Sequence, residues 1–173
     1  MPLGPDAEKL AVLWFVCLGG ICRSPILATV AGEHLRRAGE SAIATRLAGA
    51  APWARVRRPH RDAVAAARRA GYAIAGRSSS HLDIPDVRAH ALIVADRRVA
   101  AVVRQSVSRP EAVVDLSDFE AISPSLRGGV PDPHGRGPAA FDHVVEIAEL
   151  LMPGLMERLS VGSSTSHAGR PDR

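Results

Sequence analysis

The fold of this chain is decided by one short stretch, Val16-Cys17-Leu18-Gly19-Gly20-Ile21-Cys22-Arg23-Ser24-Pro25. It follows an apolar run over residues 11–16, which predicts a buried strand, and it leads into residues 25–39, whose apolar spacing predicts a helix. A strand, a short glycine-containing loop and a helix N-terminus bind phosphate-like anions, because backbone N–H groups and the helix dipole converge on one point. The stretch therefore predicts a phosphate-binding loop after the first strand.

Side chains in this loop add chemistry to the anion site. Gly19 and Gly20 permit the positive φ that such a loop needs, and Arg23 can donate two N–H groups to two phosphate oxygens. The field that binds an anion also favours the thiolate form of a cysteine, which makes Cys17 a candidate nucleophile. Ser24 is predicted to cap the helix that follows the loop.

The residues Cys17, Arg23 and Ser24 form the pattern Cys-x5-Arg-Ser, with a second cysteine at Cys22 and the stretch Pro131-Asp132-Pro133-His134 near the end of the chain. Over residues 11–160 the chain resembles the low-molecular-weight protein tyrosine phosphatases. The resemblance implies that the Cys17 thiolate attacks phosphorus and forms a cysteinyl-phosphate, which water then hydrolyses. It also implies that Arg23 clamps the phosphate, that Asp132 is the general acid, and that Ser24 helps the thiolate to leave.

The resemblance further implies which residues surround the phosphate and the rest of the substrate. These are the loop residues and two cleft walls: Leu18, Gly19, Gly20, Ile21, Cys22, Ser24, Trp53 and His134. Cys22 is expected either to pack in the core or to trap oxidised Cys17 as a disulfide. Asp115, Asp118 and Asp142 are rival candidates for the acid.

Two positions depart from the family pattern. Many members have asparagine where this chain has Gly20, held by a serine and a histidine whose places here correspond to Leu47 and Arg77. Many also have tyrosine where this chain has His134. These departures bear on which substrate the protein binds rather than on which reaction it catalyses.

The remaining pattern predicts a single α/β domain, a four-stranded parallel sheet with helices on both faces. The other strands are expected at 42–47, 91–95 and 112–116, and the other helices at 62–70, 97–105 and 141–159, the last kinked or broken at Pro153. Residues 78–80 are interpreted as a polar break and residues 117–140 as a long functional loop. The domain is expected to span 11–160, with a disordered lead at 1–10 and a disordered tail at 161–173.

Composition limits the classes of function. The 173 residues suit one domain, and the net charge is +4, carried by arginines with Lys9 as the only lysine. Few aromatic residues are present to stack on bases, so no nucleic-acid partner is expected. Two close cysteines favour a reducing cytoplasm, and no signal peptide or membrane-spanning run is predicted.

Four functions remain open at this point. The first is hydrolysis of phosphotyrosine in proteins, and the second is hydrolysis of a small phosphate ester such as a sugar or aryl phosphate. An arsenate reductase shares the loop but requires further cysteines, and this chain has only Cys17 and Cys22. The fourth is a non-catalytic anion-binding module. No cofactor or metal is expected, and the protein is expected to be a monomer or a weak dimer.

Overall fold

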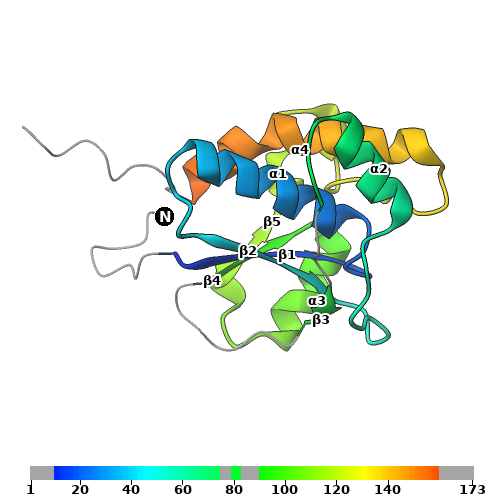
Figure 1. Ribbon diagram of the computed structural model, residues 1–173. Helices are drawn as coiled ribbons and strands as arrows, with labels where there is room; N and C mark the ends of the chain where they lie inside the picture. Colours follow the sequence, from blue (N-terminus) through cyan, green and yellow to red (C-terminus); the bar gives the residue numbers. More distant parts are fainter. Residues whose placement is uncertain (1–9, 75–78, 83–89, 160–173) are drawn as a thin grey trace, which may run out of the picture.

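The centre of the computed structural model, which describes residues 10–74, 79–82 and 90–159, is a parallel β-sheet (Figure 1). Its strand order is β3-β2-β1-β4-β5, and each neighbouring pair is parallel. The strands are β1 (Val12–Cys17), β2 (Ala44–Gly49), β3 (Ser80–His81), β4 (His90–Val94) and β5 (Val113–Asp115). The apolar β1 lies in the middle, so its carboxyl end delivers the phosphate-binding loop to the centre of one sheet edge.

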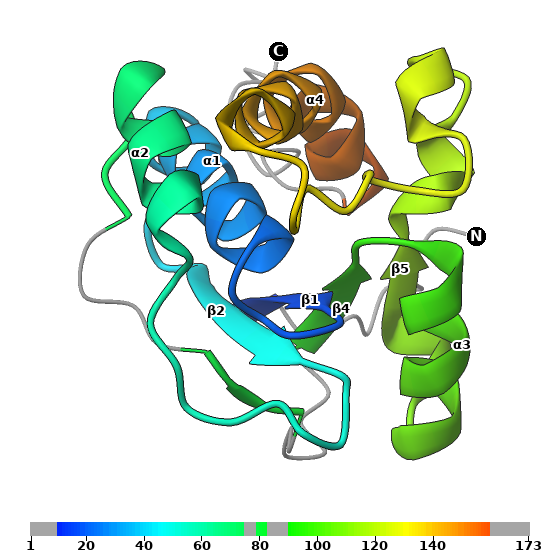
Figure 2. The same ribbon diagram turned by 90° about the vertical axis from the view of Figure 1, so that its right-hand side faces the viewer.

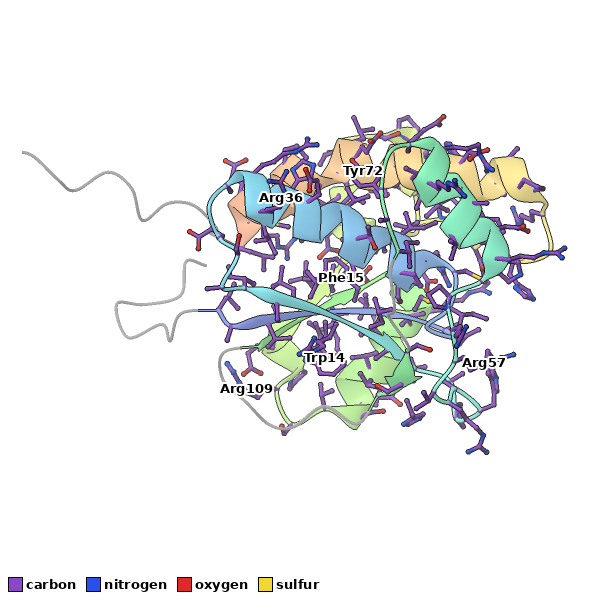
Figure 3. The ribbon with its side chains drawn as sticks, viewed as in Figure 1. Trp14, Phe15, Arg36, Arg57, Tyr72 and Arg109 are labelled. Carbon is purple, nitrogen blue, oxygen red and sulfur yellow. The ribbon has the colours of Figure 1, made fainter. Side chains whose placement is uncertain are left out.

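Helices cover both faces of the sheet, as Figure 2 shows. On one side lie α1 (Arg23–Arg37), α2 (Arg61–Arg69) and α4 (Pro138–Arg158), and on the other lies α3 (Arg97–Ser106). Short 3-10 turns are η1 (Pro110–Ala112), η2 (Leu116–Phe119) and η3 (Pro124–Leu126). Successive residues of a strand point to opposite faces, so Phe15 packs toward α1 and Trp14 toward α3 (Figure 3).

The predicted single α/β domain, its parallel sheet and its two helical layers are confirmed, but the strand count of four is wrong. The fifth strand is β3, which pairs with β2 through Ala48 with Ser80 and Gly49 with His81. It lies where the sequence predicted only a polar break. Ser80 and His81 are both polar, so they form no apolar pattern from which a strand could be predicted. The strand forms because the backbone of these residues pairs with the exposed edge of β2.

All four predicted helices are present with ends shifted by at most three residues, and the first and last of them also differ from the prediction in other ways. The first helix begins at Arg23 with Cys22 at its N-cap, so the prediction that Ser24 caps it is wrong. The last helix, α4, runs as one helix through Pro153 and is not broken there. Leu151, Met152 and Leu155 around this proline are fully buried, and their packing holds the helix together where one backbone N–H is missing.

The predicted disordered lead and tail lie outside the described residues, except for Leu10. Arg77, one of the two positions compared with the family's asparagine network, also lies outside them. Across residues 10–74, 79–82 and 90–159, no helix combines the length and apolar character needed to cross a membrane.

Candidate active site

The phosphate-binding loop starts at Cys17, the last residue of β1, and ends where α1 begins. The N–H of Gly20 donates a hydrogen bond to Cys17 Sγ at 3.2 Å, and Gly20 adopts a φ of 74°. Cys17 is buried, with 2% of its surface exposed. The loop backbone therefore places an N–H donor directly on the sulfur atom of Cys17.

The carbonyl groups of the loop are held from outside by the segment that follows β2. The N–H groups of Ala50, Ala51 and His60 donate to the carbonyl oxygens of Cys17, Leu18 and Ile21 at 3.0, 2.9 and 2.8 Å, respectively. These bonds turn the carbonyls away from the sulfur. The backbone N–H groups, rather than the carbonyl oxygens, are therefore free to point into the centre of the loop. An anion bound there requires such hydrogen-bond donors.

Gly20 lies directly against the end of β2. A Cβ at this position would come within 2.8 Å of the Ser79 Cβ and 2.9 Å of the backbone of Ala48 and Gly49. Ser79, rather than Leu47, is therefore the neighbour of this position, and Leu47 is buried in the core. Close backbone packing holds the loop here, in place of the side-chain network that the family comparison suggested.

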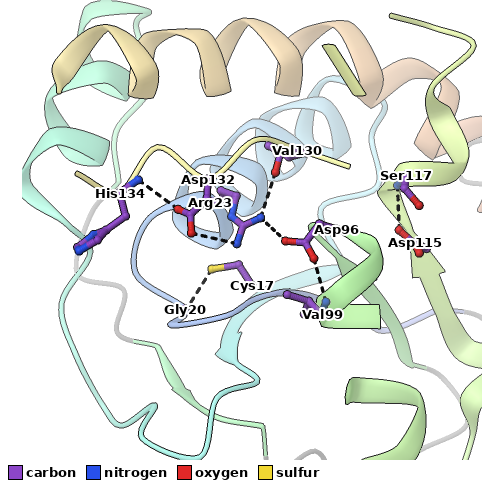
Figure 4. A network of polar contacts seen from close by, with 10 residues as sticks. All are labelled: Cys17, Gly20, Arg23, Asp96, Val99, Asp115, Ser117, Val130, Asp132 and His134. Atoms are coloured by element: carbon purple, nitrogen blue, oxygen red, sulfur yellow. Dashed lines mark hydrogen bonds and ion pairs between the residues drawn. The ribbon is translucent and has the colours of Figure 1, made fainter. Parts of the chain in front are cut away.

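Arg23 connects the loop to two distant segments, as Figure 4 shows. Its side chain is 4% exposed, and one guanidinium nitrogen donates to Asp96 Oδ2 at 2.5 Å and to the Val130 carbonyl at 3.0 Å. A second nitrogen lies 3.7 Å from Asp132 Oδ2. Burial lowers the pKa of Arg23, but the negative charges of Cys17, Asp96 and Asp132 outweigh it and the net direction is upward.

Two buried donors in the first turn of α1 have no hydrogen-bond partner among the described residues. They are the Arg23 Nε and the Ser24 hydroxyl, on residues that are 3% and 0% exposed. Leaving a buried polar group without a hydrogen bond costs about 1–3 kcal/mol of folding free energy. A bound group that accepts hydrogen bonds from these two donors would recover that cost. No hydrogen bond joins Ser24 to Cys17 within the described part of the chain.

Asp132 stands on the loop before α4, and 48% of its side chain is exposed. Its Oδ1 accepts a hydrogen bond from the His134 N–H at 3.1 Å, which fixes the carboxylate in a tight turn (Figure 4). The rival carboxylates have other partners, since Asp115 Oδ1 accepts from the Ser117 N–H, Asp118 pairs with Arg158 and Asp142 pairs with Arg69.

Cys22 is buried and has a different environment from Cys17. Its Sγ lies 3.8 Å from His134 Nδ1, and both cysteines are free thiols. Burial raises the pKa of Cys22 to about 12, and the negative charges of Cys17 and Asp132 add to the rise. Cys22 is therefore a neutral thiol at physiological pH.

The expected cleft walls contact different residues of the loop, since Trp53 lies against Gly19 and His134 lies near Cys22. Trp53 is 54% exposed with its ring against Gly19, where an added Cβ would meet the ring edge at 3.0 Å, and Leu18 is 44% exposed. His134 packs edge-on against His60 at 5.7 Å, and His60 stacks on Phe141 at 5.0 Å between ring centres. The wall at His134 is thus a pair of histidine rings that packs on the ring of Phe141.

Sequence reasoning did not identify Asp96, His60 or the Val130 carbonyl as parts of the site. Asp96 had a detectable signal, because it follows the buried strand β4 at the sheet edge where ligands bind. The other two act through backbone groups or ring stacking, which leave no motif. Within the described ranges, no group of three or more histidine, cysteine, aspartate or glutamate side chains could hold a metal ion.

Comparison with known proteins agrees with this geometry. The family described as low molecular weight phosphotyrosine protein phosphatase matches residues 12–164. The low molecular weight protein-tyrosine phosphatase A of Mycobacterium tuberculosis is 29% identical over 142 residues, which are 82% of this chain and 86% of that protein.

Solved structures share the fold. A protein tyrosine phosphatase from Entamoeba histolytica superposes with a TM-score of 0.75 at 20% identity, covering 94% of this chain and 99% of that one. The YwlE arginine phosphatase, from Bacillus subtilis, gives 0.72 at 22% identity, covering 87% and 96%. With the family matched over nearly the whole domain, this chain belongs to the low molecular weight phosphotyrosine protein phosphatases.

Proposed function

We propose that this protein hydrolyses phosphotyrosine through a cysteinyl-phosphate on Cys17, with Arg23 as the phosphate clamp and Asp132 as the general acid. The observation that carries the proposal is the position of Arg23. Its guanidinium group lies between the Cys17 loop and the loop of Asp132, within 3.7 Å of the Asp132 carboxylate. A phosphate on this arginine would place its ester oxygen toward a proton donor.

In the first step, the Cys17 thiolate attacks phosphorus, an S–P bond forms and the P–O bond to the tyrosine oxygen breaks. Asp132 transfers its proton to that oxygen, which leaves as a neutral phenol. Charge accumulates on the three remaining phosphate oxygens. The Arg23 Nε–H and the inward N–H groups of the loop are the donors that stabilise it.

In the second step, water attacks the cysteinyl-phosphate and Asp132, now a carboxylate, accepts a proton from it. The S–P bond breaks and Cys17 leaves as a thiolate, releasing inorganic phosphate. The Ser24 hydroxyl, buried and without another partner in the described structure, is available to donate to the departing sulfur. This role replaces the helix cap that the sequence suggested.

The cleft walls favour an aryl ester over a charged metabolite. Leu18 and Trp53 offer exposed apolar surface beside the loop, which suits the ring of a tyrosine. His134 supports a second candidate substrate, a small phosphate ester that forms a hydrogen bond with the imidazole ring. The cytoplasm is the proposed location, because the free Cys17 thiol must remain reduced.

The direct test is turnover of p-nitrophenyl phosphate and of a phosphotyrosine peptide, without added metal, beside Cys17→Ser. We expect both substrates to be hydrolysed by the wild type and neither by the variant, whose hydroxyl is a far weaker nucleophile. Turnover of the small ester alone would favour a metabolite substrate. No turnover by folded, reduced protein would contradict the proposal.

The role of Asp132 is tested by the leaving group. Asp132→Asn removes the proton donor, so we expect about 10²–10⁴-fold loss on phenyl phosphate, whose leaving group needs a proton. The loss on p-nitrophenyl phosphate, with a more stable leaving anion, should be smaller. Equal losses on the two esters would argue against Asp132 as the acid.

A further inference from the structure

The positive charge of this protein is concentrated in one segment beside the active site. Residues 53–69 contain six arginines and one carboxylate, Asp62, so their formal charge is +5. The whole chain has a net charge of +4, so everything outside this segment sums to −1. The excess positive charge therefore comes from one stretch of the chain rather than from a uniform bias of the sequence. The six arginines are Arg55, Arg57, Arg58, Arg61, Arg68 and Arg69.

This segment, which we call the arginine segment, is built onto the phosphate-binding loop. The Trp53 ring lies against Gly19, and the His60 N–H donates to the Ile21 carbonyl. Between them, Arg57 pairs with Ser79 in an antiparallel bridge, which fixes the backbone of the segment. Figure 3 shows Arg57 at the end of the sheet where, in the same view in Figure 1, β1 reaches its carboxyl end.

The arginines nearest the loop are exposed and carry charges that the described structure does not neutralise. Arg55, Arg57 and Arg58 are exposed and form no ion pair with any residue in the described ranges. By contrast, Arg69 pairs with Asp142 at 2.6 Å. Exposed apolar side chains lie among these cations, since Trp53 is 54% exposed and Val56 is 76% exposed.

The other three arginines of the segment lie on α2. An open groove of about 510 Å³ on this helix is lined by Arg61, Val64, Ala65, Arg68 and Arg69. The groove does not include Cys17, so it is separate from the site of chemistry. Its lining combines cationic and apolar groups, the same mixture as the loop around Trp53.

We propose that the arginine segment is a docking surface for acidic residues that flank the phosphotyrosine of a protein substrate, an inference that rests on the proposed function. A peptide whose phosphotyrosine reaches Cys17 must place its neighbouring residues against the rim of the loop, and the Trp53 side of that rim is cationic. Carboxylates there gain attraction from several unneutralised guanidinium groups, which raises the rate and strength of encounter. A membrane or a nucleic acid explains the charge but not its attachment to the phosphate-binding loop.

The test compares two phosphotyrosine peptides of equal length, one with aspartate and glutamate on both sides and one with serine and glutamine there. For the full-length wild type we expect kcat/KM to be about tenfold higher for the acidic peptide. In Arg57→Gln/Arg58→Gln this ratio should fall to about two, mainly through KM. In the wild type, raising salt from about 50 mM to about 500 mM should also lower the ratio toward one, because salt screens exposed charges.

The matched control is Arg98→Gln/Arg104→Gln on α3, which removes two exposed arginine charges that lie outside the arginine segment. We expect its peptide ratio to equal that of the wild type. Equal kcat/KM for the two peptides in the wild type, or equal effects of the two double variants, would overturn the inference. So would tight binding to phosphatidylserine vesicles or a single-stranded oligonucleotide without peptide discrimination.

The two proposals fail in different ways. Hydrolysis of p-nitrophenyl phosphate and of both peptides at equal efficiency removes only the docking surface. Absence of hydrolysis of all three by folded, reduced protein removes the phosphatase assignment and the docking surface with it. The salt dependence needs no variant, so it decides the question even where Arg57→Gln/Arg58→Gln does not fold.

Discussion

At Gly20, the absence of a side chain determines how closely the phosphate-binding loop can approach β2. The φ of 74° is one that asparagine tolerates, but its Cβ would lie 2.8 Å from the Ser79 Cβ and 2.9 Å from the β2 backbone. Backbone atoms cannot rotate away as a side chain can. The asparagine common in related proteins therefore does not fit here without movement of β2 or Ser79.

We predict that Gly20→Asn lowers the free energy of unfolding by about 1–3 kcal/mol, the usual cost of overpacking, and lowers phosphatase activity as well. Urea unfolding and kcat/KM on p-nitrophenyl phosphate measure the two effects. Gly39→Asn is the matched control, because Gly39 has a φ of 76° and no heavy atom within 4 Å of an added Cβ. Similar losses in both variants would assign the effect to φ alone.

Cys22 differs from Cys17 in reactivity because of its raised pKa. A pKa of about 12 keeps Cys22 protonated at pH 8, and only the thiolate is alkylated rapidly. We predict that limited iodoacetamide treatment of the folded protein at pH 8 modifies Cys17 and spares Cys22. Both lie in the tryptic peptide of residues 10–23, so fragment ions must assign the label. Equal labelling of the two cysteines in folded protein would contradict this, and equal labelling after unfolding is the control.

At the scale of elements, the loop carrying Asp132 is held against the junction of β4 and α3. The Val130 N–H donates to the Ala95 carbonyl at 2.7 Å, and Gly129 forms an antiparallel bridge with Asp96. Gly129 has a φ of 110°, and an added Cβ would lie 2.5 Å from both the Ala95 oxygen and the Asp96 Cα. The loop can approach this junction only with glycine at the contact.

We predict that Gly129→Ala displaces the loop, weakens the bond from Arg23 to the Val130 carbonyl and lowers kcat at least tenfold on phenyl phosphate, with about 1–3 kcal/mol of lost stability. Steady-state kinetics and urea unfolding test this. Gly128→Ala is the control in the same loop, because its φ is 79° and an added Cβ would meet nothing within 4 Å. Equal kinetics in the two variants would show that close packing at Gly129 does not position the acid.

The elements also show which features can be predicted from sequence. Strands β1 and β4 were predictable because residues 12–17 and 91–94 are continuously apolar and mostly buried. Strand β3 was not, because Ser80 and His81 pair through backbone alone at the sheet edge. The start of α1 was predicted too late because a serine before a proline is typical of a cap, whereas here the loop already ends at Cys22.

On the scale of the whole molecule, the helical layer of α1, α2 and α4 provides stability while the sheet edge provides chemistry. Leu151 of α4 is fully buried in the core between this layer and the sheet. We predict that Leu151→Ala lowers the free energy of unfolding by about 2–5 kcal/mol and leaves kcat/KM unchanged well below the melting temperature. Leu150→Ala, at a neighbouring position that is 52% exposed, should change neither quantity. Calorimetry and steady-state kinetics test the pair, and loss of activity in folded Leu151→Ala would refute the separation.

The arrangement of the whole chain also explains why the phosphate-binding loop could be predicted from the sequence, whereas the residues that hold Arg23 in place could not. The Cys17 to Ser24 loop is contiguous, so its chemistry can be recognised from adjacent letters. Asp96 and Val130 reach Arg23 from positions 73 and 107 residues away, and only the sheet order brings them together. The charge of the arginine segment was visible in composition, but its function could be proposed only once Trp53 and His60 were seen on the loop.

The contacts of Arg23 also have a consequence for biosynthesis. The nucleophile and the clamp leave the ribosome early, whereas the groups that orient the clamp are translated 73 and 107 residues later. A nascent or prematurely terminated chain ending before Asp96 therefore contains the Cys17 thiol and the Arg23 guanidinium group but neither of the two groups that orient Arg23. On the proposed mechanism, catalysis therefore requires nearly the entire domain, from Cys17 to Asp132, to have been synthesised.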